Sequence, residues 1–496
     1  MSHHPITGHD PLEEYLQNLT RRRFFGSMAS TLTGGLGASA LSSLIAEGAI
    51  AAAPGVGNLL QSLPHHAPKA KRIIYMHMEG GPSQIDMFDH KPGLRERFDA
   101  DLPDSIRMGQ RITTMTSGQD RLPVAPSMFS FKRYDNNQDG VQISELMPHT
   151  AAMSKDICFI HSMHTQSINH EPGITFFQTG QEQPGRPSFG SWMSYGLGAE
   201  TEDLPAFVVM ISQGFGNTQA LSARFWGSGF LPSEHQGCQL RSGRDAVLHL
   251  RDPDGVSRED RRRMLDLASE INQAEYERSG DEAALARIAQ AEMAYRMQMS
   301  VPELTDISGE SKETLEMYGS EVHTPGSFAA NCLRARRLAE RGVRFIQLYQ
   351  RGWDQHNNLP GEIRQQCNAV DQAQAALLQD LKQRGMLDDT LVLWAGEFGR
   401  TVYSQGTLTT ENYGRDHHPR CFTVWLAGGG IKPGITYGKT DDYSYNILEN
   451  PVSVHDLHAT MLHQMGIEHT KLTRKHQGRD FRLTDVGGTV VHDILT

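Results

Sequence analysis

The first strand signal in the chain is Arg72-Ile-Ile-Tyr-Met-His-Met78, an apolar run that stops at the turn residues Glu79-Gly80-Gly81-Pro82. A short apolar run bounded by glycine and proline predicts a buried strand followed by a turn. Helical patterns at 328–341 and 368–384 precede two further runs of this kind, as in the crossover units of a parallel sheet. We therefore expect an α/β protein with a large, mostly parallel sheet. The other strand candidates are residues 157–161, 206–211, 343–349, 390–395 and 421–427.

The N-terminus has the features of a twin-arginine export signal. Thr20-Arg21-Arg22-Arg23-Phe24-Phe25 precedes a weakly apolar stretch, 26–53, which ends in small residues before Pro54. Paired arginines ahead of such a stretch are typical of this signal class. The alternatives are a membrane anchor or an ordinary helix, but the stretch is poor in large aliphatic side chains. We expect a signal at 1–53, a polar linker at 54–71 and a periplasmic or secreted protein that meets the membrane only during export.

Composition limits the remaining classes of function. The 496 residues carry a formal charge of −11 without a long basic run in the body, so nucleic acid is not an expected partner. The five cysteines are widely scattered and form no CxxC pair, which supports neither a disulfide framework nor a cysteine metal site. The segment at about 258–318 is highly charged and has helical spacing, so we expect a helical insertion within a domain that spans 72–490.

Unusual polar residues follow the predicted strands at the points where they end. In an open parallel sheet, ligands collect beyond the carboxyl ends of the strands. Three such loops supply carboxylates and imidazoles, which together suit zinc, manganese or iron, whereas calcium prefers oxygen alone. The alternative is that these loops hold only helix caps and hydrogen-bonded turns. The candidate metal ligands in the loops are Asp354, His356, Glu397, Asp416, His417 and His418.

Several motifs together resemble the bacterial family called domain of unknown function 1501, a branch of the alkaline phosphatase and sulfatase superfamily. The resemblance spans residues 72 to about 480, and its combination of motifs is specific although each motif alone is weak. The motifs are Met78-Glu-Gly-Gly-Pro-Ser-Gln-Ile-Asp-Met-Phe-Asp89, Ser144-Glu-Leu-Met-Pro-His149, Asn169-His-Glu-Pro172, Thr179-Gly180, Pro187-Ser-Phe-Gly-Ser-Trp-Met-Ser-Tyr-Gly196, Gly352-Trp-Asp-Gln-His356, Gly396-Glu-Phe-Gly-Arg-Thr401, Arg415-Asp-His-His-Pro419 and Gly478-Arg479.

The resemblance implies an alkaline-phosphatase-like three-layer sandwich with one or two divalent metals at the strand ends. It implies a phosphate or sulfate ester as substrate, either a small anionic ester or a sulfated glycan. The first-strand metal ligand would be Glu79 or, less directly, Asp86. Phe398 stands where a second-metal ligand would be, and His170 stands where the superfamily has its Ser, Thr or Cys nucleophile. His170 and Arg400 are therefore the expected catalytic residues, and Asn169 and Arg415 the expected substrate-binding residues.

Two other functions remain open at this point. The missing oxygen or sulfur nucleophile also fits a catalytically silent binding or structural protein that keeps the fold. Residues 135–145 mimic the start of an EF-hand calcium loop, but the closing Glu145 comes one position early and no convincing helix precedes the loop. The sequence predicts neither the substrate, nor the number of metals, nor the oligomeric state.

Overall fold

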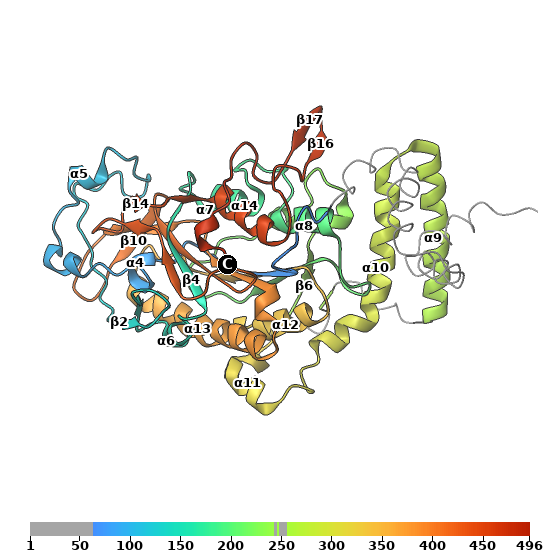
Figure 1. Ribbon diagram of the computed structural model, residues 1–496, viewed down its shortest axis with the longest axis horizontal. Coiled ribbons are helices and arrows are strands. Elements are labelled where there is room, and N and C mark those ends of the chain that lie inside the picture. The colour runs from blue at the N-terminus through green and yellow to red at the C-terminus, as the bar shows by residue number, and fades with distance from the viewer. Residues whose placement is uncertain (1–62, 243–245, 248–254) are drawn as a thin grey trace, which may run out of the picture. The chain divides into compact units, whose positions relative to one another are not determined.

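The computed structural model describes residues 63–242, 246–247 and 255–496 (Figure 1). The expected export signal at 1–53, and the linker up to residue 62, lie outside the described residues. No helix in the described ranges is long and apolar enough to cross a membrane.

A nine-stranded sheet organises the domain, and β1 (Arg72–Glu79) lies inside it between β7 and β8. β1 runs parallel to both neighbours, and β5 and β6 continue the parallel part on the side of β7. On the side of β8, β11 is antiparallel to β8 and to β4, while β12 and β15 pair in parallel with β4. The expected mixed α/β fold with a large, mostly parallel sheet is confirmed. The bounds are β4 Ile157–His164, β5 Phe207–Ser212, β6 Cys238–Leu240, β7 Phe345–Arg351, β8 Thr390–Ala395, β11 Phe422–Ala427, β12 Ile435–Tyr437 and β15 Val452–Ser453.

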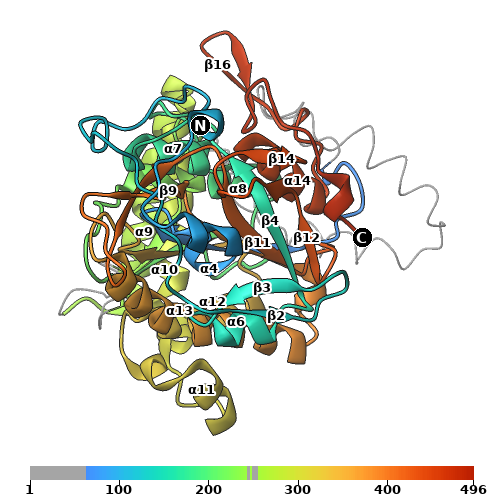
Figure 2. The ribbon, with the colours of Figure 1, turned by 90° about the vertical axis from the view of Figure 1, so that its left-hand side faces the viewer.

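Both faces of the sheet are covered, which explains why its strands read as continuous apolar runs. Alternate residues of β1 enter two different cores: Ile74 and Met76 pack in one, Ile73 and Tyr75 in the other. The first core is completed by α6 (Pro148–Ala152), α12 (Phe328–Glu340) and α13 (Leu359–Gln383). The second is completed by α7 (His170–Thr179), α8 (Phe189–Leu197) and α14 (Val454–Gln464). Figures 1 and 2 show these two helix groups on opposite sides of the sheet, so the domain has three layers.

The remaining elements lie around this sandwich. α9 (Arg258–Ser279), α10 (Glu282–Thr305) and α11 (Lys312–Tyr318) occupy the charged segment at 258–318, and Figure 1 shows α9 and α10 as a helical hairpin at one end of the domain. Two-stranded sheets form from β9 (Gly399–Gln405) with β10 (Gly414–His418), and from β2 (Phe131–Tyr134) with β3 (Val141–Ser144). The other short elements are α4 Gln84–Met87, α5 Asp104–Arg107, β13 Lys439–Thr440, β14 Ile447–Glu449, β16 Arg474–His476 and β17 Arg479–Phe481.

The calcium-loop mimic is a β-hairpin turn. Residues 135–140 connect β2 to β3, so a strand and not a helix enters the loop. The side-chain oxygen of Asn136 accepts the backbone N–H groups of Gln138 and Gly140, at 2.9 and 2.7 Å. Gly140 has a φ of +85°, which a hairpin turn needs and glycine adopts without strain. This segment therefore has the geometry of a turn and not of an EF-hand.

Candidate metal centre

The candidate site lies at the carboxyl ends of β1, β7 and β8, where an open parallel sheet gathers its ligands. Asp354 and His356 follow β7, while Glu397 follows β8. β10 adds His417, and the first residue of α7 adds His170. The close approach of these loops depends on Gly80, whose φ is +117° and whose added Cβ would lie 2.5 Å from the Asp354 nitrogen. The turn after β1 thus lets the β7 loop pack directly against it.

Three histidines direct the same ring atom toward one carboxylate oxygen. Asp354 Oδ1 lies 3.0 Å from His170 Nε2, 2.7 Å from His356 Nε2 and 3.4 Å from His417 Nε2. One donor atom from each of these four residues falls within 4.8 Å of the others. A tetrahedral ion with bonds of about 2.0–2.1 Å separates its ligand atoms by roughly 3.3 Å. The three separations of 2.7–3.4 Å from Asp354 Oδ1 are on this scale, while the four donor atoms as a set lie within 4.8 Å of one another.

Each histidine is held from behind through its other ring nitrogen. The Nδ1 atoms of His170, His356 and His417 lie 2.7 Å from Glu397 Oε1, 2.6 Å from Gln405 Oε1 and 2.7 Å from the Ile168 carbonyl oxygen. An acceptor at Nδ1 fixes the tautomer that leaves Nε2 free to bind a cation. His170 Nε2 is buried and makes no well-aligned hydrogen bond although Asp354 is close. These residues fit a bound divalent metal.

The other oxygen of Asp354 is held by two amide side chains. Asn217 Nδ2 and Gln219 Nε2 donate to Asp354 Oδ2 at 2.7 and 3.0 Å, while Arg400 donates to Oδ1 at 2.7 Å. Burial alone would raise the pKa of Asp354. The three histidines and Arg400 outweigh burial and hold that pKa far below its usual range. Asp354 is thus a fixed anion aimed at the cluster.

The histidines differ in their affinity for protons. Burial lowers the pKa of His170, but its contacts with Asp354 and Glu397 outweigh burial and raise that pKa to about 9. Burial is also the main influence on His417 and lowers its pKa to about 4, despite the nearby Asp354. Because a metal binds only neutral imidazole, cation binding would release the proton of His170.

Glu397 and Glu79 lie beneath the cluster and are not among its four ligands. Glu397 accepts the Gly80 N–H at 3.0 Å and lies 3.4 Å from His77 Nε2. Burial raises the pKa of Glu397, but His170 and His77 outweigh it and lower that pKa to about 2. Glu79 accepts the backbone N–H groups of Gln219 and Gly352, at 3.1 and 3.2 Å. Burial, reinforced by the charge of Glu397, raises the pKa of Glu79 to about 8.

The raised pKa of Glu79 predicts a pH-dependent cost to stability. The pKa of Glu79 is 4.5 in the unfolded chain and about 8 in the folded chain. Between these two pH values the folded chain binds more protons at Glu79 than the unfolded chain, so the contribution of Glu79 to stability falls as the pH rises. Glu79→Gln removes this titration. For metal-free protein, we expect the difference between the melting temperatures of the variant and the wild type to increase by at least about 2 °C from pH 5 to pH 8. Differential scanning fluorimetry across that range measures the difference, and a constant difference would contradict the prediction.

Four of the other expected site residues make internal contacts instead. Arg415 pairs with Asp86, with 2.8 Å between Nε and Oδ2, and both side chains are fully buried. Asp416 accepts the hydroxyls of Thr113 and Thr116. His418 Nε2 lies 2.8 Å from the Tyr445 carbonyl oxygen. Asp86, Asp416 and His418 therefore lie outside the ligand cluster, and Arg415 has no donor directed toward a substrate.

Arg400 holds the loops around the site together through hydrogen bonds. Its Nε donates to the Gly81 carbonyl at 2.8 Å and its Nη1 to the Arg415 carbonyl at 3.1 Å. Its Nη2 contacts the carbonyls of Gly80 and Trp353 in addition to Asp354. Since the guanidinium is fully buried and its donors are occupied, Arg400 orients the Asp354 carboxylate and has no donor left for the anionic group of a substrate.

Phe398 and Asn169 both lie next to the cluster, Phe398 as a buried ring and Asn169 as an exposed side chain. The Phe398 ring lies with its centroid 5.0 Å from that of His170 and 4.6 Å from that of His417, so an apolar ring occupies the position where the family resemblance implies a second-metal ligand. Asn169 is exposed and precedes His170 at the start of α7. Asn217 and Gln219, which donate to Asp354, are not among the site residues expected from the sequence, although they follow β5, where the strand-end rule places ligand-binding residues.

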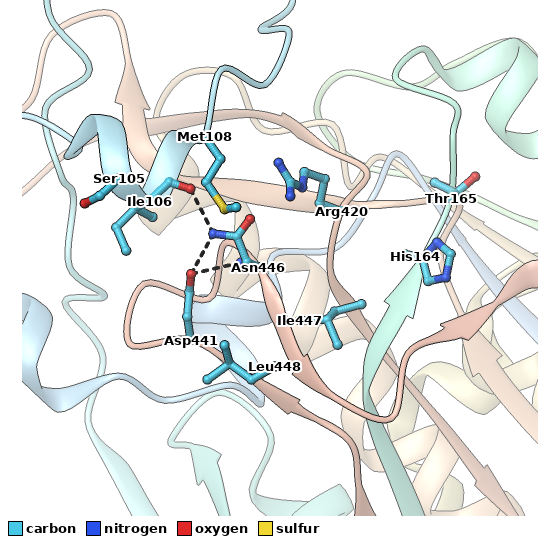
Figure 3. Close-up of a pocket in the computed structure, with 10 residues that line it drawn as sticks. All are labelled: Ser105, Ile106, Met108, His164, Thr165, Arg420, Asp441, Asn446, Ile447 and Leu448. Atoms are coloured by element: carbon cyan, nitrogen blue, oxygen red, sulfur yellow. Dashed lines mark hydrogen bonds between the residues drawn. The ribbon is translucent and has the colours of Figure 1, made fainter.

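A cavity of about 540 Å³ is lined by residues that lie close in sequence to the ligands His170 and His417, among them Thr165 and Arg420; Figure 3 shows its lining. The segment 165–168 connects the cavity to the ligand cluster. Thr165 lines the cavity, and its backbone N–H donates to the Pro419 carbonyl at 2.9 Å, while the Ile168 carbonyl contacts His417. Arg420 points into the cavity beside Met108 and Asn446. Its Nη1 donates to Gln110 Oε1 at 3.5 Å. The lining residues are Ser105, Ile106, Met108, His164, Thr165, Arg420, Asp441, Asn446, Ile447 and Leu448.

Comparison with solved structures finds members of the alkaline phosphatase superfamily, all distant in sequence. Alkaline phosphatase from the Antarctic bacterium TAB5 is 12% identical with a TM-score of 0.30, over 74% of this chain and 95% of that one. A superfamily protein from Vibrio parahaemolyticus is 10% identical with a TM-score of 0.34, over 88% and 78%. Phosphonate monoester hydrolase from Silicibacter pomeroyi is 12% identical with a TM-score of 0.27, over 64% and 68%.

The comparison with curated proteins gives no match. A family model described as "Protein of unknown function (DUF1501)" matches residues 70–495, which is nearly the whole described domain. The family suggested by the sequence motifs is confirmed: this chain belongs to the DUF1501 family.

Proposed function

We propose that this protein is a metal-dependent hydrolase of phosphate or sulfate esters that holds one divalent cation with His170, Asp354, His356 and His417. The observation that carries the proposal is the convergence of three Nε2 atoms on Asp354 Oδ1, with every Nδ1 atom engaged from behind. Three imidazoles and one carboxylate suit zinc, manganese or iron. With one further coordination position open to water or an ester oxygen, a cation of this kind would polarise that oxygen and lower the pKa of the water.

The chain's own residues supply orientation. Glu397 holds the His170 ring, and Asn217 and Gln219 hold Asp354, so the ligand atoms stay in place when a substrate arrives. Ser167 follows Thr165 in the stretch before His170, but its hydroxyl donates to Glu182 and is committed there. We therefore propose direct attack of water on the phosphorus or sulfur, which releases the alcohol and the inorganic anion.

The cavity lined by Arg420, three residues after the ligand His417, would suit a substrate with an anionic group and an apolar body, the anion lying at Arg420 and away from Asp441. Arg420 has no carboxylate partner among the described residues, and Ile106, Met108 and Leu448 provide apolar surface around it. An arginine fork suits a sulfate or phosphate oxygen pair or a carboxylate. A small anionic ester, or one sulfated unit of a glycan, matches these groups.

Metal removal tests the proposal. We expect purified protein to contain about one equivalent of a transition metal by mass spectrometry. Chelation should abolish hydrolysis of aryl phosphates or sulfates and lower the melting temperature, because the metal binds only the folded chain. Adding back zinc, manganese or iron should restore both.

Two variants make this experiment specific. His356→Ala should reproduce the chelated state, whereas His149→Ala, which changes an exposed histidine on α6, should behave as wild type. Bound metal without turnover on a broad ester panel would instead favour the catalytically silent binding protein. Absence of metal from protein prepared with zinc, manganese and iron would overturn the metal site.

We also propose that the protein is exported through the twin-arginine route. The motif Thr20-Arg21-Arg22-Arg23-Phe24-Phe25 supports this proposal. We expect cell fractionation to place the wild-type chain outside the cytoplasm and a variant with lysine at both Arg21 and Arg22 inside it. Equal distribution of the two chains would contradict the proposal.

A further inference from the structure

One face of α9 is apolar and points away from the domain. α10 packs on the opposite face, where Leu265 and Gln273 are buried and Arg262 pairs with Glu292. Met264, Leu267 and Ile271 are 53%, 58% and 63% exposed. Their spacing of three and four residues puts them on one stripe of the helix. Isolated exposed apolar residues are common, but three in one stripe form an apolar surface whose burial against a partner is energetically favourable.

We propose that this stripe binds the same stripe of a second copy of the protein, with the two α9 helices antiparallel about a two-fold axis. Such an interface is isologous, so each residue i of one copy faces a residue j of the other and the sum i + j stays constant. The two-fold axis would cross the stripe at the height of Ser269 along the helix, so i + j equals twice 269, which is 538. This inference is independent of the proposed hydrolase activity.

The apolar residues of the stripe pair correctly under this symmetry. Leu267 of one copy faces Ile271 of the other, and Met264 faces Ala274, which is also exposed. At 100° per residue, all four lie within about 40° of one midline along the helix. The apolar side chains thus meet one another on both sides of the axis.

The charged residues at both ends of the stripe are also self-complementary. Asp260 of one copy faces Arg278 of the other, and Arg263 faces Glu275. Within one copy these groups already form two exposed ion pairs, Arg263 with Asp260 and Arg278 with Glu275, at 2.8 and 2.7 Å. The two-fold arrangement brings an Asp–Arg pair of one copy against a Glu–Arg pair of the other with opposite charges in contact. A parallel pairing would instead put each charged residue against the identical residue of the other copy, so like charges would meet.

The interface is of modest size. α9 has 22 residues and is therefore about 33 Å long, so a single helix pair buries less than a standard stable interface. We expect a dimer that forms in the micromolar range and weakens with added salt, because its end charges are exposed to solvent.

Sedimentation velocity of the full chain, from about 1 to about 200 µM, tests this. We expect the wild type to shift from monomer to dimer. Leu267→Glu together with Ile271→Glu should remain monomeric with an unchanged melting temperature, because both positions are exposed. The matched control is Lys312→Glu, a charge reversal at an exposed position of α11 that should dimerise as wild type does.

A mixing experiment identifies the partner surface. Arg263→Glu sets two acidic groups against each other in its homodimer, and Glu275→Arg sets two basic groups against each other. Each variant alone should therefore dimerise at least about tenfold more weakly than wild type, while an equimolar mixture of the two should recover dimers. A monomeric wild type, or dimers that persist in the double-glutamate variant, would overturn the proposal. Failure of the mixture to exceed either variant would overturn the antiparallel register.

Discussion

Asp354→Ala is expected to lose bound metal and to lower ester hydrolysis by more than about a hundredfold. Asp354 Oδ1 is the atom on which the three histidine Nε2 atoms converge, so the variant removes one ligand and the centre of the site. Loss of a residue that merely orients a ligand already costs about 10–100-fold in metal affinity or activity. Metal content by mass spectrometry and kcat/KM on an aryl ester measure the two effects together.

The control for Asp354→Ala is Asp480→Ala, which removes an exposed carboxylate on β17. We expect this variant to keep wild-type metal content and turnover. Thermal unfolding of both variants separates loss of the site from loss of the fold, because Asp354→Ala also leaves Arg400 buried without its carboxylate partner. A folded Asp354→Ala protein that retains metal and activity would show that the cation binds elsewhere.

Arg415→Ala is expected to destabilise the protein by about 3–5 kcal/mol, the usual cost of leaving one partner of a buried ion pair alone. Arg415 contacts Asp86 through Nε at 2.8 Å and donates to the carbonyls of Thr401 and Ala125, both at 2.9 Å. Burial raises the pKa of Asp86, but Arg415 outweighs burial and lowers it. The variant leaves a buried carboxylate uncompensated. Urea unfolding followed by circular dichroism gives the change in the free energy of unfolding.

A double variant isolates the charge from the packing. Asp86→Leu with Arg415→Met removes both charges while keeping similar volume, at the cost of the hydrogen bonds that the Ser83 and Tyr413 hydroxyls donate to Asp86. We expect it to unfold at a higher urea concentration than Arg415→Ala alone. Wild-type stability of Arg415→Ala would mean that the pair contributes little to the fold.

The sheet could be predicted from the sequence because buried parallel strands are short apolar runs. The runs at 157–161, 206–211, 343–349, 390–395 and 421–427 fall on β4, β5, β7, β8 and β11 with shifts of a few residues at their ends. The antiparallel direction of β11 could not be predicted, because it depends on how the chain returns to the sheet and not on which residues are apolar.

The convergence of Asp354, His356 and His417 followed from the same strand-end rule, but the neighbours of His417 show the limit of that rule. In a strand, successive side chains point to opposite faces. Within β10, His417 faces the cluster while Asp416 and His418 contact Thr116 and Tyr445. A run of three polar residues in sequence does not reveal which face will meet the site. The place of His170 among the ligands depends on how α7 packs against the loop after β8, where Gly173 lies against Glu397 and Phe398, and that contact is not encoded locally.

The contacts of Arg400 have a consequence for how the protein is made. This one side chain contacts the turn after β1 at Gly81, the loop after β7 at Asp354 and the start of β10 at Arg415. These loops are distant along the chain, so the ion site cannot assemble on the ribosome before His417 has been synthesised. A cation would then be acquired only by a chain that has completed nearly all of its long-range folding, and metal loading would report on correct folding.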